Sequence, residues 1–155
     1  MEITITSASR LDAINILRLQ QLCYQSEANI YGDFSIPPLT QTLNSLLEEF
    51  VSHRILIARK GPDIIGSVRA CETGTGCHIG KLIVHPQQQR QGIGSGLMRR
   101  IEKEFANARR YELFTGHLSE GNLRLYHRLG YQEFKRKNIT PNLIMVYLEK
   151  LTSNG

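Results

Sequence analysis

The segment Val84–Leu97 constrains the fold of this chain more than any other part of the sequence. An apolar, strand-like stretch ends at Pro86, a polar, glutamine-rich loop follows, and the spacing of apolar residues then becomes helical around Gly92, Gly94 and Gly96. Because glycines lack a Cβ atom, the backbone there can approach a bulky anion, and the N–H groups of a first helical turn point toward such an anion. The segment predicts a strand–loop–helix unit that holds a phosphate group. The alternative is a glycine turn that only packs helix against strand.

Two other phosphate-binding motifs fit this sequence less well. The run 92–97 is not GxGxxG, because its last position is leucine, and the neighbouring strands look antiparallel, which does not suit a dinucleotide-binding unit. The run 76–82 is one residue short of a P-loop and lacks the serine or threonine of that motif.

The periodicity of apolar residues predicts an alternation of strands and helices along the whole chain. The spacing predicts strands at 2–6, 55–58, 64–71, 79–84, 111–116, 131–134 and 143–148, and helices at 10–29, 39–50, 93–105 and 119–129. A flexible segment at 72–76 separates two of the strands. Strands joined by such short turns are antiparallel. The expected fold class is therefore α+β, with a mostly antiparallel central sheet.

Length and composition favour one intracellular domain. The 155 residues suit a single domain over 1–151 with a flexible tail at 152–155. The three cysteines are odd in number and fit no disulfide framework, and the N-terminus has no signal-peptide pattern. No apolar run reaches the length of a membrane span. These features predict a cytoplasmic protein with reduced thiols and no membrane partner.

The net charge of +5 and the pI of about 9.3 favour an acidic partner such as a phosphorylated ligand. Nucleic acid is not expected, because the basic residues form no stripe with interleaved aromatic residues. A metal site is not expected either. The spacing of Cys71, Cys77, His78 and His85 matches no usual zinc site, and His85 reads as part of a turn.

Two separated motifs resemble one known family. The residues Gln89–Gly94 match the signature Gln/Arg-x-x-Gly-x-Gly/Ala, and Leu82–Pro86 matches the strand and proline that precede it. About 30 residues later, Asn122–Tyr131 is similar to the pattern Asn-x-x-x-Tyr-x-x-x-Gly-Phe/Tyr. Both motifs, in this order and with this order of elements, resemble the GNAT superfamily of acetyl-CoA-dependent N-acetyltransferases over nearly the whole chain.

This resemblance implies a fold and a cofactor. The implied fold is a mixed, mostly antiparallel sheet of six to seven strands flanked by about four helices, with a splay between the fourth and fifth strands where acetyl-CoA (coenzyme A) lies. The family often has arginine at the position of Gln89, whereas here Arg90 follows one residue later. The residues implied to bind the cofactor are Leu82, Ile83, Val84, Gln89, Arg90, Gln91, Gly92, Ile93, Gly94, Ser95, Asn122 and Tyr126.

The resemblance also implies direct transfer of the acetyl group to a primary amine in a ternary complex. Tyr126 occupies the position of the family's general-acid tyrosine, although a core aromatic is the alternative reading. His78 stands where many relatives carry a glutamate base, with Glu72 and His117 as rivals. Each of these three could equally be a solvated or structural residue. The backbone N–H of Val84 is the implied partner of the oxyanion.

The acceptor side is implied to lie on the first two helices and their loop. Acidic and aromatic residues there suit a cationic amine, although ordinary loop packing would explain them as well. The candidates are Tyr24, Glu27, Tyr31, Asp33 and Phe34. The sequence leaves open whether the amine belongs to a small molecule or a peptide, and whether the chain forms a homodimer. The alternative function is a non-catalytic acyl-CoA-binding sensor or interaction module.

Overall fold

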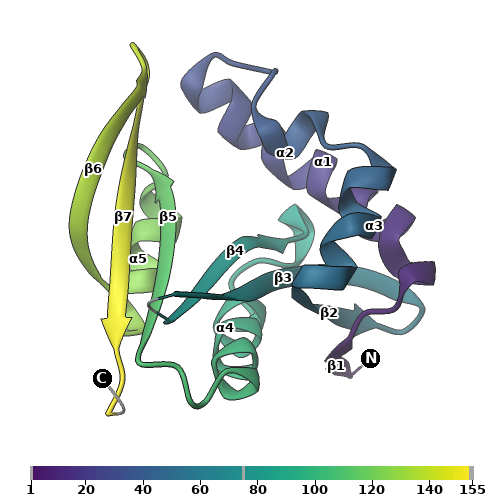
Figure 1. Ribbon diagram of the computed structural model, residues 1–155. Coiled ribbons are helices and arrows are strands. Elements are labelled where there is room, and N and C mark those ends of the chain that lie inside the picture. The colour runs from purple at the N-terminus through teal and green to yellow at the C-terminus, as the bar shows by residue number, and fades with distance from the viewer. Residues whose placement is uncertain (1, 75, 154–155) are drawn as a thin grey trace.

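The computed structural model describes residues 2–74 and 76–153 (Figure 1). The strands are β1 (Ile3–Ser7), β2 (Arg54–Lys60), β3 (Asp63–Thr73), β4 (Gly76–Val84), β5 (Arg110–Gly116), β6 (Gln132–Thr140) and β7 (Leu143–Leu151). The helices are α1 (Ala13–Tyr31), α2 (Pro37–Thr40), α3 (Leu43–Ser52), α4 (Ile93–Glu104) and α5 (Glu120–Arg128), with 3₁₀ turns at Arg10–Asp12 and Pro86–Gln88.

The described residues form one seven-stranded sheet in the order β1-β2-β3-β4-β5-β7-β6. Every neighbouring pair is antiparallel except β4 and β5, which run parallel. The predicted α+β class and the mixed, mostly antiparallel sheet are therefore confirmed. None of the described helices combines the length and apolar character needed to cross a bilayer.

The parallel strands β4 and β5 separate soon after they meet. Within the described chain they pair at two positions, Cys77 with Tyr111 and His78 with Glu112. Figure 1 shows β4 then turning away from β5 toward the side of α1. The predicted splay between the fourth and fifth strands is therefore present, and it leaves the second half of each strand without the other as a partner.

A β-bulge lies where β4 turns away. Ser67 of β3 pairs with Ile83 and Arg69 pairs with Gly80, so Lys81 and Leu82 together face a single residue of β3. Lys81 has a φ of +52°, in the left-handed region that costs a non-glycine residue about 1–2 kcal/mol. Because a bulge bends its strand and increases the local twist, it accounts for the departure of β4 from β5.

The core lies on both faces of the sheet. On one face α4 and α5 cover a cluster that includes Leu56, Ile79 and Leu113, and on the other α1 and α3 cover Ile55 and Ile57. Figure 1 shows α1, α2 and α3 on the side opposite α4. Both clusters pack on the same sheet, which is consistent with a single domain. The domain limits of 1–151 stay a prediction.

The helix predicted at 39–50 is wrong as one element, because the chain breaks it into α2 and α3. Gln41 and Thr42 are extended between them, and the Thr42 hydroxyl accepts a hydrogen bond from the N–H of Ser45 at 3.1 Å. This N-cap starts a new helix. The described chain thus has five α-helices rather than about four.

Most strands and the tail also differ from the predicted limits, and β3, β4, β6 and β7 are each longer than predicted. β3 and β4 extend into the segment predicted to be flexible, where Thr73 pairs with Gly76, and Thr75 lies outside the described residues. β6 extends to Thr140, beyond its predicted end. It is an edge strand whose residues are exposed on both faces, so its sequence lacks the alternation of apolar and polar residues that would have predicted its length. In the predicted tail, the N–H of Thr152 donates to the Arg109 carbonyl at 3.0 Å, while residues 154–155 lie outside the described chain.

We predict that Gly76→Ala lowers the stability of the fold. A Cβ atom at Gly76 would overlap the carbonyl oxygen of Arg110 at the point where β4 and β5 pair. The expected loss is about 1–3 kcal/mol, or about 3–10 °C in melting temperature for a chain of this size. Thermal unfolding followed by circular dichroism measures it. Gly74→Ala is the matched control, because a Cβ there meets nothing within 4 Å. Equal melting temperatures for both variants would contradict this account of the junction.

Candidate active site

Two cavities adjoin along the gap between β4 and β5. The first, here called the loop cavity, has a volume of about 450 Å³. It lies between α1, α5 and the segment 88–95, which is called the glycine loop. The second, called the apolar cavity, has about 370 Å³ and lies between α1, the α1–α2 loop, β4, β5 and the β6–β7 hairpin. Both are lined by Tyr24, Glu27, Leu82 and Asn122. These four residues mark the junction of the two cavities.

The glycine loop gives one wall of the loop cavity an anion-binding backbone. Arg90 and Gly92 both have left-handed φ angles, +65° and +79°, and the first hydrogen bond inside α4 runs from the N–H of Gly96 to the carbonyl of Gly92 at 2.9 Å. The N–H groups of residues 93–95 precede that bond, so they are available at the positive end of the helix dipole. Backbone segments in which residues switch into the left-handed conformation can also form a concavity whose N–H groups bind an anion.

The side chains around the loop cavity favour an anion as well. Arg90, Arg124 and Arg128 line it, and Glu27 at the junction is the one acid among its described lining residues. Gly92 and Gly94 line the cavity, and a Cβ at Gly92 would meet nothing within 4 Å, so the backbone is open there. Backbone donors, three guanidinium groups and an open glycine together fit a ligand with several phosphates.

Of the residues predicted to bind a cofactor, ten line the loop cavity and two do not. The ten are Leu82, Ile83, Val84, Gln89, Arg90, Gly92, Ile93, Gly94, Ser95 and Asn122. The Gln91 side chain instead donates to Gln88 Oε1 at 3.3 Å, and Tyr126 lines the apolar cavity. The Val84 carbonyl accepts bonds from Cys23 Sγ and Gln89 Nε2, both at 3.4 Å. His85 Nδ1 accepts from the N–H of Gln87 at 3.1 Å, inside the turn.

Tyr126 lies on α5, one helical turn after Asn122, and is only 6% exposed. Burial raises the pKa of its hydroxyl above the ordinary value near 10, and nearby Tyr24 and Glu27 act in the same direction. The phenol therefore keeps its proton at neutral pH. Since Tyr126 lines the apolar cavity together with Asn122, it can donate that proton close to the junction.

The structure brings only one of the three predicted base candidates together with Tyr126. His78 lines the apolar cavity, and burial lowers the pKa of its imidazole, which is therefore neutral at pH 7. Glu72 is exposed and lines a different cavity beside Phe105. The N–H of Ile144 donates to His117 Nδ1 at 3.0 Å. Neutral His117 therefore carries its proton on Nε2, and its acceptor lone pair is already in use.

A chain of hydrogen bonds crosses the gap from α1 to the start of α5. The Ser119 hydroxyl donates to Glu27 Oε2 at 2.6 Å, and the N–H of Leu118 donates to the Tyr31 oxygen at 3.0 Å. Tyr31 and Ser119 lie 2.8 Å apart. Because Ser119 has a single proton, which Glu27 accepts, Tyr31 is the donor to Ser119. The Tyr31 ring passes so close to Gly116 that a Cβ there would overlap its hydroxyl.

The sequence predicts that Glu27 lies on the acceptor side, but it does not predict its position at the junction of the two cavities. Glu27 was assigned to the acceptor side with Tyr24, Tyr31 and Asp33, and all four line the apolar cavity, whereas Phe34 is 57% exposed and lines neither cavity. Its position at the junction, beside the cofactor side, was missed. One sequence signal pointed there: Tyr24, Glu27 and Tyr31 are spaced i, i+3 and i+7, which puts them on one helix face.

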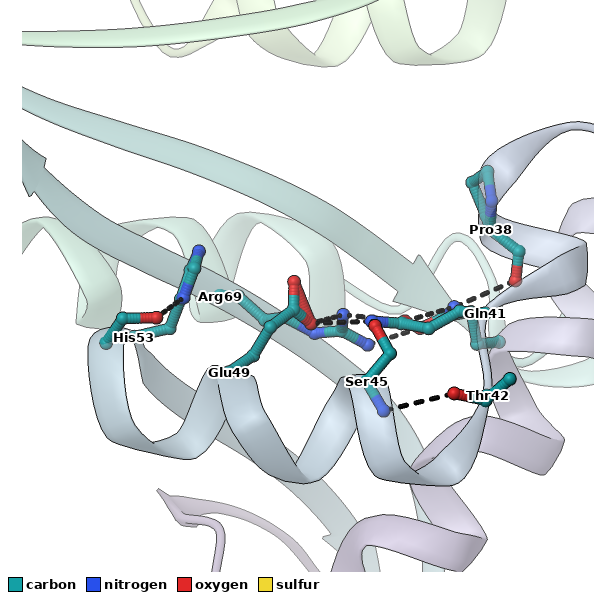
Figure 2. Close-up of polar contacts among 9 residues, drawn as sticks. Pro38, Gln41, Thr42, Ser45, Glu49, His53 and Arg69 are labelled. Carbon is teal, nitrogen blue, oxygen red and sulfur yellow. Dashed lines mark hydrogen bonds and ion pairs between the residues drawn. The ribbon is translucent and has the colours of Figure 1, made fainter.

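A buried arginine joins β3 to α3 and to the connection between α2 and α3 through hydrogen bonds (Figure 2). Arg69 of β3 is 2% exposed, and its Nη1 donates to Glu49 Oε2 at 2.6 Å and to Gln41 Oε1 at 3.2 Å. Its Nη2 donates to Gln20, whose own amide donates to the Pro38 carbonyl at 2.8 Å. Pro38 lines the apolar cavity, so this network positions α2 against α1 and β3. Sequence analysis did not identify it.

Comparison with known proteins decides the family. The sequence matches the family described as the acetyltransferase (GNAT) domain over residues 51–133, which is more than half of the chain and includes the glycine loop and Tyr126. The chain belongs to the GNAT acetyltransferase family. The resemblance inferred from the two motifs is thereby confirmed.

Solved structures share this GNAT fold over almost the whole chain. The PaiA N-acetyltransferase of Thermoplasma acidophilum in complex with coenzyme A has a TM-score of 0.80 at 17% identity, covering 98% of this chain and 100% of that protein. The ribosomal-protein-S18-alanine N-acetyltransferase of Escherichia coli has a TM-score of 0.80 at 14% identity, covering 97% and 94%. YncA of Salmonella typhimurium, a putative acetyltransferase solved with acetyl-CoA, has a TM-score of 0.76 at 15% identity, with the same coverage.

One curated protein matches this chain in sequence over part of that protein's length. The UPF0157 protein YqkA of Bacillus subtilis (strain 168) is 27% identical over 134 residues, which are 86% of this chain. The chain spans only 38% of the length of YqkA.

Proposed function

We propose that this chain transfers the acetyl group of acetyl-CoA directly to a primary amine within a ternary complex, with Tyr126 as general acid. One observation carries the proposal: an anion-binding cavity and an apolar cavity meet at Tyr24, Glu27, Leu82 and Asn122, beside a buried tyrosine that keeps its proton. Phosphates bind on one side, the acceptor amine enters on the other, and the groups that react come together at the junction.

The residues of the loop cavity fit coenzyme A. The N–H groups of residues 93–95 and the side chains of Arg90, Arg124 and Arg128 would hold its phosphates, and the backbone of residues 82–84 would line its pantetheine arm. When bound, acetyl-CoA supplies an acetyl group activated as a thioester. Val84 belongs to the part of β4 that lacks β5 as a partner, and we assign its N–H to the acetyl oxygen.

Direct transfer is supported by the state of the nearest thiol. Cys23 lines the loop cavity, but its Sγ donates to the Val84 carbonyl, and burial raises its pKa to about 12. The thiolate, which is the nucleophilic form, is therefore scarce at pH 7. An acyl-cysteine intermediate is not needed, because the amine can attack the thioester itself.

The acceptor amine must lose a proton, and we assign its removal to Glu27. An alkylamine with a pKa near 10 is about one part in a thousand neutral at pH 7, which costs about 4 kcal/mol. The Glu27 carboxylate lies at the junction, and its Oε2 is oriented by the chain from Tyr31 through Ser119. His78 lines the apolar cavity but not the loop cavity, and so stands farther from the cofactor side. Tyr126 then protonates the leaving sulfur.

We expect Tyr126→Phe to lower kcat by about 10²-fold or more, while the Kd for coenzyme A changes little. The substitution removes the proton donor and keeps the ring. Release of free thiol from acetyl-CoA in the presence of a panel of amines measures kcat, and calorimetry measures Kd. Tyr147→Phe is the matched control, because Tyr147 lines neither cavity. Unchanged turnover in Tyr126→Phe would remove the acid role. Wild-type binding of coenzyme A without thiol release for any amine would favour the non-catalytic sensor instead.

We expect Glu27→Gln to lower kcat by about 10²–10⁴-fold and His78→Gln to lower it far less. The pH dependence separates the two candidates. Burial lowers the pKa of His78, so a histidine base would stay neutral at pH 7 and lose activity only as the pH falls below about 6.5. Stopped assays from pH 5 to 9 test this. Near-normal turnover in Glu27→Gln, together with loss of that acid dependence in His78→Gln, would transfer the base role to His78.

A further inference from the structure

The apolar cavity is lined by a lysine that forms no ion pair with any described residue. Its charged lining residues are Glu27, Asp33 and Lys81. Asp33 accepts hydrogen bonds from the N–H and the hydroxyl of Ser35, at 2.8 and 2.6 Å, in the α1–α2 loop. Among the described residues, the Lys81 ammonium makes no ion pair within 4 Å and no hydrogen bond, and its side chain is partly buried.

Glu49, the acid that acts on Lys81 electrostatically, is already paired with another cation. Glu49 and Arg69 both act on Lys81 electrostatically, with opposite signs. Glu49 Oε2 already accepts from Arg69 Nη1 at 2.6 Å and from Gln41 Nε2 at 2.9 Å, as Figure 2 shows. Arg69 and Glu49 thus pair with each other, and Lys81 lines the cavity without an acid of its own. Burial, reinforced by Arg69, lowers the pKa of Lys81, as expected for an ammonium without a counter-ion.

An ammonium in apolar surroundings is costly unless an anion accompanies it. The remaining walls of the cavity are largely apolar and include Ile36, Phe114, Leu143 and Met145. Lys81 is also held in a left-handed conformation by the bulge of β4, and such unfavourable conformations of non-glycine residues concentrate at binding sites. The cavity therefore presents the Glu27 carboxylate at the junction, the Lys81 ammonium on the β4 wall, the Asp33 carboxylate on the α1–α2 loop, and an otherwise largely apolar lining.

We propose that the acetyl acceptor is a small aminocarboxylate with an apolar side chain, such as an α-amino acid, whose carboxylate binds Lys81 while its amine faces Glu27. This inference rests on the proposed function and specifies its acceptor. The volume of about 370 Å³ suits a single small molecule of this kind. Opposite charges at two places in the cavity fix the orientation of the acceptor, so that its amine, and not its carboxylate, reaches the junction.

The binding test uses the two reaction products and does not depend on turnover. N-acetyl-leucine carries the carboxylate, and N-(3-methylbutyl)acetamide is the same molecule without it. Calorimetry with coenzyme A present should show that wild type binds N-acetyl-leucine at least tenfold more tightly, since a charge-assisted bond contributes that much or more. Lys81→Gln should lose this preference, and Lys81→Arg should keep part of it. Equal affinities of wild type for both products would overturn the proposal.

The kinetic test compares leucine with 3-methylbutylamine by the ratio of their kcat/KM values. The ratio should fall at least tenfold in Lys81→Gln relative to wild type, and comparing ratios cancels the intrinsic reactivity of each amine. Lys103→Gln, on the exposed face of α4, is the control and should keep the wild-type ratio. If the enzyme releases thiol but the ratio is unchanged by Lys81→Gln, the acceptor assignment is wrong, while the proposed function still stands. Failure to release thiol with any amine would sink the proposed function.

Discussion

The separation of β4 from β5 is the constraint on which the site depends. The strands pair at two positions, and the bulge at Lys81 and Leu82 then bends β4 away. Two neighbouring parallel strands would normally share a continuous ladder, whose N–H and carbonyl groups satisfy one another. Here the second half of each strand is left to line cavities. The backbone of residues 82–84 thus becomes available to a ligand in the interior of a seven-stranded sheet.

A gap of this kind needs supports that hold its two sides at a set distance. The chain from Tyr31 through Ser119 to Glu27 spans it at one end, and Gly116 gives the tyrosine the room to do so. Behind β4, the Arg69 network fixes α2 and α3 against the sheet. These supports are polar and largely withdrawn from water, which strengthens each hydrogen bond and makes its loss costly. They keep the apolar cavity open beside the loop cavity.

Local patterns in the sequence predicted most of this architecture, and long-range contacts account for what they missed. The glycine loop and the helix of Tyr126 are short motifs, so their places were readable from the sequence. The break at Thr42 depends on one hydroxyl that competes with an apolar helical pattern. Bonds such as Glu27–Ser119 and Arg69–Gln20 join residues that are 92 and 49 positions apart. No periodicity encodes such pairs, which explains why the junction role of Glu27 emerged only from the structure.

The most direct test of this account is a crystal structure of the protein with coenzyme A bound, in which the position of the sulfur atom is located. We predict that the phosphates contact residues 92–95 and the arginines of the loop cavity. The sulfur should lie at the junction of the two cavities, next to the Tyr126 hydroxyl and the Glu27 carboxylate. A sulfur atom outside this junction, or coenzyme A in the separate cavity beside Glu72, would contradict the claim that the parting of β4 and β5 creates the site.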